Sequence, residues 1–382
     1  MADKDLGLHK KMTVLLGYIN PGMKYLPDGT VDHSVFFERH PFEQGSFPRL
    51  KKGGVDAAVV SFGVNGNEFF SGKAGIVRQF QVVINFLKET ACRSDRAELA
   101  YSVKDIKRIV REGKIAFLLH LTGVNLDGDI AILHAFYDLG VRAIHPFFDS
   151  RFPLEDTVPA AKDAKGLTEF GRKVIREMER LGMVVDVSHC SDTSFWQILE
   201  MTEKPVVASH SNCRALCFNQ RNLDDRQIEA IARSGGVIGV HFASGLIDLA
   251  CAGSFQATGF YKNLELWEEE LRKKYPDPYV YLAHRFSDWW YTSEFYRMEK
   301  AVAPAPLERL IDHIDRIVKI AGIDHVGIGS DYDLSSIPSE VETADKLPNL
   351  TKALRRRGYS EGDIQKIWGD NFLRVYRKVI GS

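Results

Sequence analysis

The amino-acid sequence predicts an α/β protein whose single domain, residues 1–382, is a (β/α)8 TIM barrel. Between Gly166 and Asn222, two stretches with helical spacing alternate with two short apolar runs, and short turns join them. Such alternation indicates parallel strands covered by helices. The length of 382 residues suits one barrel with an insertion.

Two histidines directly follow these apolar runs. His189 ends the segment MVVDVSH, and His210 ends the segment PVVASH. The carboxyl ends of barrel strands face the active site, so the two imidazoles should converge there. Neutral imidazole is a common zinc ligand. The alternative is that each histidine is a polar strand end that hydrogen-bonds a loop, but the repeated context favours metal binding.

Composition excludes several classes of protein. Lys and Arg (50) nearly balance Asp and Glu (51), so we expect no nucleic-acid partner. The polar N-terminus lacks the apolar core of a signal peptide, and no apolar run is long enough for a membrane span. The five scattered cysteines suit reduced thiols. We therefore expect a cytoplasmic protein without a membrane partner.

Four segments resemble the membrane (renal) dipeptidase family, which is peptidase family M19 of the amidohydrolase superfamily. They are residues 47–64, 138–144, 322–333 and 359–379. The resemblance covers nearly the whole chain and implies the same barrel. It also implies a hydrolase that attacks an amide carbonyl with two zinc ions and a bridging hydroxide.

The resemblance assigns roles to several residues. The family's metal-binding histidines are separated by 21 residues, as His189 and His210 are here. Arg221 matches the arginine that grips the substrate carboxylate, a task that suits the guanidinium fork. Asp331 matches the aspartate that contacts the substrate amine and helps to move the proton, so we expect it to be catalytic.

The predicted first strand, residues 12–18, departs from the family at its end. The family has Asp-Gly-His-Asn-Asp here, and its His and second Asp hold one zinc ion. Aligning Gly17 with the family glycine places Tyr18 at the His and Asn20 at the Asp. Neither is a good zinc ligand. We therefore expect the first metal position to be lost, with Tyr18 catalytic and Asn20 binding substrate.

The middle strands depart further. Residues 55–62 form the predicted second strand and residues 114–123 the third, where the family's metal-bridging glutamate is replaced by Thr122. His120 lies two residues earlier, on the same face of the strand. It is a candidate third metal ligand, and the alternative is a histidine satisfied within the core.

The predicted fourth strand, residues 141–148, follows a predicted helix at 127–140. An ungapped match places Phe148 where the family has a histidine that polarises the substrate. His145 lies three positions upstream and is a candidate substrate-binding residue, although strand parity argues against it.

The remaining elements follow in order. Residues 167–182 predict a helix with Thr168 as N-cap, and residues 235–242 predict the seventh strand. His241, near the end of that strand, has no assigned role. The last predicted helix opens at Ser360 with a capping-box pattern.

An insertion at residues 243–305 follows the seventh strand, so it should emerge on the catalytic face. It is rich in large aromatic side chains. Such an insert is typical of a lid or an oligomer contact, and we expect a homodimer.

Three functions remain open at this point. One is a dipeptidase-like hydrolase of a small, carboxylate-bearing substrate that uses at most one zinc or other divalent ion, held by His189, His210 and either His120 or Asp331. Another is a metal-independent lyase, isomerase or dehydratase. The third is an inactive homologue. Because buried charges are costly in a dead pocket, we favour an enzyme, and of the two enzymes the hydrolase.

Overall fold

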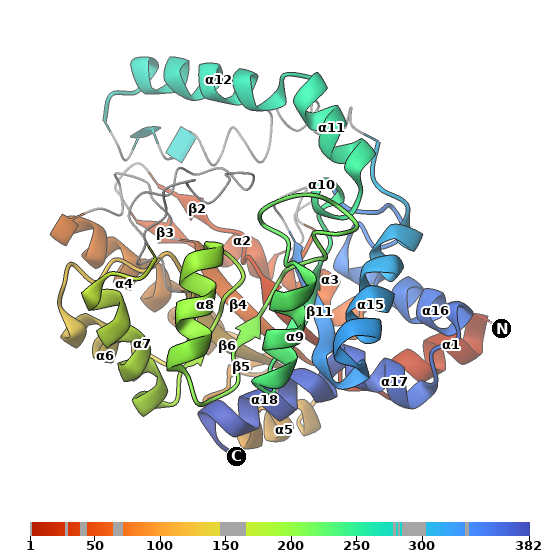
Figure 1. Cartoon of the computed structure of the whole chain (residues 1–382). Coiled ribbons are helices and arrows are strands. Elements are labelled where there is room, and N and C mark those ends of the chain that lie inside the picture. The colour runs from red at the N-terminus through yellow and green to blue at the C-terminus, as the bar shows by residue number, and fades with distance from the viewer. Residues whose placement is uncertain are drawn as a thin grey trace.

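Eight parallel strands form a nearly closed barrel, which confirms the predicted fold (Figure 1). The computed structural model describes residues 2–26, 30–38, 44–63, 72–145, 166–277, 280–281, 283–284, 303–332 and 336–382. The barrel strands are β1 (Leu15–Ile19), β4 (Ala57–Gly63), β6 (Ile115–Thr122), β7 (Val141–His145), β8 (Val184–Val185), β9 (Val207–Ala208), β10 (Val237–His241) and β11 (Val326–Tyr332). They neighbour one another in the order β8-β7-β6-β4-β1-β11-β10-β9. A parallel bridge between Asp186 and Val207 joins the two ends of this order.

Helices surround the barrel and cover its outer face (Figure 1). They are α3 (Phe47–Lys52), α4 (Gly72–Ala91), α5 (Val103–Arg111), α6 (Ile130–Asp138), α7 (Glu169–Leu181), α8 (Asp192–Met201), α9 (Asp225–Arg233), α15 (Leu307–Ala321), α16 (Pro348–Arg357), α17 (Glu361–Gln365) and α18 (Asn371–Ile380). Smaller elements are α1 (Ala2–His9), α2 (Ser34–Phe37), the β2–β3 pair (Lys24–Tyr25 and Val31–Asp32) and the short strand β5 (Ala97–Leu99) beside β6.

The structure confirms the helix ends that were predicted from capping residues. The Thr168 hydroxyl accepts a hydrogen bond from the Gly171 N–H at 3.0 Å and so opens α7. Gly182 ends that helix with φ 75°, a left-handed conformation that favours glycine. Ser360 and Asp363 form the predicted capping box.

Strands β8 and β9 are shorter than the sequence predicts, with two residues each. Asp186 and Val187 still donate their backbone N–H groups to the Ile144 and Val207 carbonyls, but beyond them the backbone hydrogen bonds pass to a side chain. The Asp186 carboxylate accepts the N–H groups of Ser188 and Ser209, each at 3.0 Å. His189 and His210 therefore stand on loops just beyond the strands.

Phe372 closes the end of the barrel opposite to the strands' carboxyl ends. This fully buried side chain of α18 packs onto glycines in two neighbouring strands. A Cβ at Gly17 would lie 2.2 Å from the Phe372 ring, and one at Gly327 would lie 2.5 Å from it. Both glycines are therefore needed to admit the ring.

We expect Gly17→Ala to lower the free energy of unfolding by about 1–3 kcal/mol, because the added methyl group overpacks the core at Phe372. Urea unfolding measures this change. The control is Gly7→Ala in α1, where an added Cβ meets nothing within 4 Å. Equal stability of the two variants would contradict the predicted overpacking.

The insertion after β10 begins with three helices: α10 (Ser244–Ile247), α11 (Leu249–Ala257) and α12 (Phe260–Lys274). α11 and α12 extend over the barrel face opposite to α5 and α18 (Figure 1). The segment NLELWEEELRKKY, whose apolar residues have helical spacing, lies mainly within α12. Several aromatic residues of the insertion, including Trp289, Trp290 and Phe295, lie outside the described residues.

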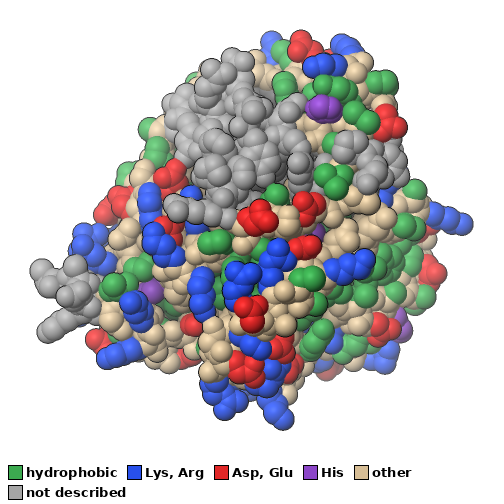
Figure 2. All heavy atoms as spheres, turned by 180° about the vertical axis from the view of Figure 1, so that it is seen from behind, with side chains coloured by type: hydrophobic (Ala, Val, Ile, Leu, Met, Phe, Trp, Pro, Cys, Tyr) green, Lys and Arg blue, Asp and Glu red, His purple; other side chains and the backbone are tan. Residues whose placement is uncertain are grey.

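Basic and acidic side chains intermingle on the face that Figure 2 shows, as the balanced composition predicts. Among the described helices, none combines the length and the apolar character that a membrane crossing requires.

Candidate active site

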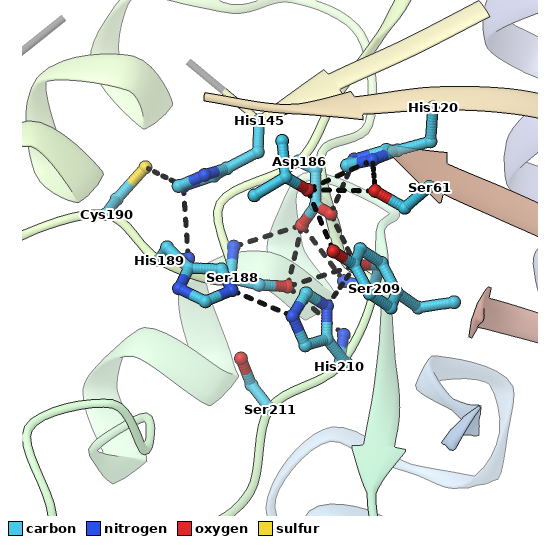
Figure 3. Close-up of polar contacts among 12 residues, drawn as sticks. Ser61, His120, His145, Asp186, Ser188, His189, Cys190, Ser209, His210 and Ser211 are labelled. Atoms are coloured by element: carbon cyan, nitrogen blue, oxygen red, sulfur yellow. Dashed lines mark hydrogen bonds and ion pairs between the residues drawn. The ribbon is translucent and has the colours of Figure 1, made fainter. Parts of the chain in front are cut away.

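His189 and His210 come together at the strand ends of the barrel, as predicted (Figure 3). Their Nε2 atoms lie 2.9 Å apart. Burial, followed by the positive charge of Arg221, holds the pKa of each imidazole well below its usual value. Both rings are therefore neutral at physiological pH, which is the form that binds a metal ion.

His145, at the end of β7, lies beside this pair. Its Nε2 accepts the His189 N–H at 3.1 Å, and its ring centroid lies 4.9 Å from that of His189. Burial lowers the pKa of His145 to about 3, so this ring is also neutral. The Cys190 sulfur lies 3.7 Å from the same Nε2. Phe148, the ungapped match to the family histidine, is outside the described residues.

Tyr18, at the end of β1, lies against the histidine pair. Its ring stacks on His210 with the centroids 3.8 Å apart, and its hydroxyl lies 2.9 Å from Thr122 Oγ1. Burial, with Asp331 as the next cause, raises the pKa of Tyr18, so the side chain remains a neutral phenol. Tyr18 and Thr122, which the sequence predicts at two metal-ligand positions of the family, thus contact each other.

Asn20 and His241 hold the carboxylate of Asp331. Asn20 Nδ2 donates to Oδ1 at 2.7 Å, and His241 Nε2 lies 2.9 Å from Oδ2. The Ala243 N–H donates to His241 Nδ1 at 3.0 Å, so the ring proton is on Nε2 and points at Asp331. The contact of Asn20 with a predicted catalytic group is consistent with its place in the site.

The backbone at Asp331 is strained. Ser330 and Asp331 have φ values of 65° and 63°, a left-handed conformation that residues other than glycine seldom adopt. Each such residue costs about 1–3 kcal/mol and is typical of functional sites. Ser330 is secured by a 2.8 Å hydrogen bond from its hydroxyl to the Tyr18 carbonyl. Strain of this kind persists only where surrounding contacts hold it, as the Tyr18 carbonyl, Asn20 and His241 do here.

His120 lies deeper in the barrel, below Thr122. Its Nδ1 lies 2.8 Å from the Ser61 hydroxyl, and its Nε2 lies 3.0 Å from Asp186 Oδ2. To bind a metal ion, the ring would have to give up one of these contacts. The predicted role of His120 as third ligand therefore requires a rearrangement.

Arg221 connects the two histidine-bearing loops. Nη1 donates to the Ser188 carbonyl and to the Ser211 hydroxyl, the latter at 2.9 Å. Nη2 donates to the His210 carbonyl at 2.8 Å and lies 3.1 Å from His189 Nε2. The guanidinium that was predicted to grip the substrate thus also braces the site itself.

Asp186, Ser61 and Ser209 contact His120 or His210 and were not predicted from the sequence. Burial alone would raise the pKa of Asp186, but the contacts with His120 and with the Ser209 hydroxyl hold it below its usual range, so the group is ionised. The missed signal was a carboxylate inside the apolar run VVDVSH, because a buried charge must be paired.

The residues present do not fit a two-zinc site. Tyr18, Asn20 and Thr122, which the resemblance places at the family's ligand positions, are engaged with Thr122, Asp331 and Tyr18, respectively. No three His, Cys, Asp or Glu side chains within the described ranges are grouped to hold a metal ion. The neutral, converging Nε2 atoms of His189 and His210 do fit two ligands of a single ion.

Comparison with known proteins agrees with this architecture. The family model described as membrane dipeptidase (peptidase family M19) matches residues 6–380. A protein of Klebsiella pneumoniae, "Uncharacterized protein in pqqA 5'region", is 33% identical over 290 residues, which are 74% of this chain and 89% of that protein. Dipeptidase tcpJ of Claviceps purpurea is 29% identical over 75% of this chain and 56% of its own length. The chain thus spans little more than half of that second relative.

Two solved structures share the fold. The probable dipeptidase PvdM from Pseudomonas aeruginosa superposes with a TM-score of 0.77 at 23% identity, covering 99% of this chain and 98% of that one. A metallo peptidase from Rhodobacter sphaeroides, liganded with a phosphinate mimic of the dipeptide L-Ala-D-Ala, has a TM-score of 0.71 at 20% identity, covering 96% and 99%. With the match over residues 6–380, the chain belongs to the membrane dipeptidase family, peptidase family M19.

Proposed function

We propose that this protein is a dipeptidase-like hydrolase that cleaves a small amide or dipeptide-like substrate. The observation that carries the proposal is the convergence of His189, His210, Tyr18 and Asp331 in a family M19 barrel. Family membership favours this hydrolase over the metal-independent lyase, isomerase or dehydratase. A dead homologue would have no use for a strained backbone at Asp331.

The chain's own residues supply binding and proton handling. The Asp331 carboxylate suits the ammonium group of a dipeptide, and Arg221 suits its carboxylate. Tyr18 carries a neutral hydroxyl that can hydrogen-bond an oxygen of the substrate. His145 lies close enough to His189 to contact the same substrate after a change of partner.

His189 and His210 would hold a single divalent ion, which in our proposal is zinc. When bound, such an ion polarises an amide carbonyl and lowers the pKa of a bound water. The third predicted ligand is His120 or Asp331. Each would have to exchange a present contact, with Asp186 and with His241 respectively.

We expect the purified protein to contain at most one tightly bound transition-metal ion per chain, because the groups that would hold a second ion are absent. Inductively coupled plasma mass spectrometry after exhaustive dialysis measures the content. Two equivalents of zinc would contradict the proposal and would mean that Tyr18 and Asn20 are misaligned with the family ligands. Chelation should lower activity, and one added equivalent of zinc should restore it.

The activity itself is tested with a panel of unmodified and N-acylated dipeptides, with L-Ala-D-Ala included because a solved neighbour holds its mimic. Release of free amino acids is followed by mass spectrometry. Cleavage of unmodified dipeptides, and not of N-acylated ones, would support recognition of the amine by Asp331. No cleavage of any dipeptide, with or without zinc, would overturn the hydrolase.

We further propose that the chain is a cytoplasmic homodimer with one domain and that the insertion at residues 243–305 covers the pocket mouth or contacts the partner subunit. The position of α11 and α12 supports this proposal (Figure 1). Light scattering measures the oligomeric state. A monomer that remained active without the insertion would contradict both roles.

A further inference from the structure

The buried carboxylate of Asp186 lies between the His210 and the His120 side chains (Figure 3). Oδ1 accepts hydrogen bonds from the Ser188 N–H at 3.0 Å, the Ser188 hydroxyl at 2.7 Å and the Ser209 N–H at 3.0 Å. Oδ2 accepts the Ser209 hydroxyl and lies 3.0 Å from His120 Nε2. An ionised carboxylate can only accept, so the hydrogen of each neighbouring group must point toward Asp186.

This constraint fixes the proton on His210. The Ser209 hydroxyl gives its only hydrogen to Asp186, so its oxygen can act only as an acceptor toward His210 Nδ1, which lies 2.6 Å away. His210 must therefore carry its proton on Nδ1. Its Nε2 then presents a lone pair, which is directed at His189. The Ser188 hydroxyl oxygen accepts the His210 N–H at 3.1 Å and holds the backbone of the same residue.

Asp186 also contacts His120, which connects it through Ser61 and Thr122 to Tyr18; we call this the His120 branch and the contacts through Ser209 the His210 branch. The carboxylate favours a proton on the facing Nε2, which leaves Nδ1 to accept from the Ser61 hydroxyl at 2.8 Å. Ser61 in turn accepts from Thr122 at 3.0 Å, and Thr122 accepts from Tyr18 at 2.9 Å. With His120 protonated on Nε2, the hydroxyl hydrogens of Ser61, Thr122 and Tyr18 point one after another toward His120 Nδ1, and the Tyr18 hydrogen points toward Thr122.

We propose that Asp186 is the positioning residue of this site, and that it fixes His210 as the Nδ1–H tautomer through Ser209 and His120 as the Nε2–H tautomer by direct contact. His210 could otherwise present either a lone pair or a hydrogen to the site. Outer contacts of this kind orient a ligand imidazole, and losing one typically costs about 10–100-fold in affinity or activity. The inference deepens the proposed function, in which His210 is a site residue.

The test uses NMR of the full-length protein labelled with ¹⁵N in its histidines, because long-range ¹H–¹⁵N correlations distinguish the two tautomers. Signals are assigned from His210→Gln and His120→Gln. In the unsubstituted protein we expect His210 as Nδ1–H and His120 as Nε2–H. Asp186→Asn should abolish the single tautomer at both rings and lower kcat about 10–100-fold with little change in KM.

Two alanine variants separate the effect of Asp186 on His210 from its effect on His120. Ser209→Ala should release the tautomer of His210 alone. Ser61→Ala is the matched control, since it removes a hydroxyl from the other branch and should leave His210 unchanged. If Asp186→Asn fails to fold, the two serine variants still decide the result for His210.

A His210 that is Nε2–H in the unsubstituted protein, or that keeps a pure Nδ1–H tautomer in Ser209→Ala, would overturn the inference. Because the readout does not use activity, it is independent of the proposed function. If the tautomers are as expected but no amide is cleaved, the hydrolase fails and the positioning role of Asp186 stands.

Discussion

Arg221→Lys is expected to lower kcat/KM by about a hundredfold, because a lysine cannot replace the contacts of this guanidinium. The two terminal nitrogens of Arg221 reach the carbonyls of Ser188 and His210, the Ser211 hydroxyl and the His189 ring. A lysine has a single nitrogen and three hydrogens, so it cannot span both histidine-bearing loops. Steady-state kinetics on a cleaved dipeptide measures the effect.

The two roles of Arg221 give different kinetic signatures. Loss of a grip on the substrate carboxylate raises KM with little change in kcat, whereas loss of the brace between His189 and His210 lowers kcat. An unchanged kcat and KM would remove Arg221 from the site.

Arg214→Lys is the matched control for Arg221→Lys. Arg214 lies in the same loop and pairs with Asp192 at 3.0 and 2.9 Å, and its other hydrogen bonds go to Asn222, Gln220 and Gln227 instead of the site histidines. Lysine can keep an ion pair with Asp192, whose side chain is 54% exposed, and such a pair contributes about 0–1 kcal/mol, so kcat/KM should change by no more than about fivefold. Equal losses in both variants would point to disorder of the loop instead of a direct role of Arg221.

The sequence predicted the barrel because its strands and helices carry independent local signals. The apolar runs, the N-cap at Thr168 and the left-handed Gly182 each define an element without reference to the rest of the fold. The lengths of β8 and β9 were predicted less well. Their ladders end where the side chain of Asp186 takes over backbone N–H groups, and hydrophobic periodicity does not report such contacts.

For the site residues, too, local patterns predicted some features, and contacts between distant segments determine the others. The convergence of His189 and His210 follows from strand ends that meet at one face of a barrel, so spacing in the sequence was enough to predict it. The partners of His120 and Arg221 depend on loops that approach each other in space. Single-sequence patterns hold no information on such pairs, and the Asp331–His241 contact was missed for this reason.

Tyr18→Phe is expected to lower kcat by about a hundredfold, the usual scale for loss of a positioned acid or hydrogen-bond donor. The resemblance aligns Tyr18 with a zinc-binding histidine of the family, and the Tyr18 ring is already fixed by stacking on His210. Phenylalanine preserves that stacking, so the variant removes only the hydroxyl. Because this hydroxyl lies 2.9 Å from Thr122 Oγ1, a substrate oxygen must compete with Thr122 for its hydrogen.

Thr122→Val is the control for Tyr18→Phe, since valine keeps the shape of threonine but releases the Tyr18 hydroxyl from its partner. We expect this variant to retain activity within about tenfold, as the loss of one neutral hydrogen bond costs about 0.5–1.5 kcal/mol.

Combining Tyr18→Phe with chelation separates the two kinds of enzyme. If Tyr18→Phe is as active as the parent and chelators inactivate the protein, Tyr18 has no catalytic role and the enzyme is the hydrolase that uses a single metal ion. A hundredfold loss together with full activity in chelator would instead identify a metal-independent proton-transfer enzyme, because no metal ion would then be needed to polarise the substrate oxygen that Tyr18 contacts.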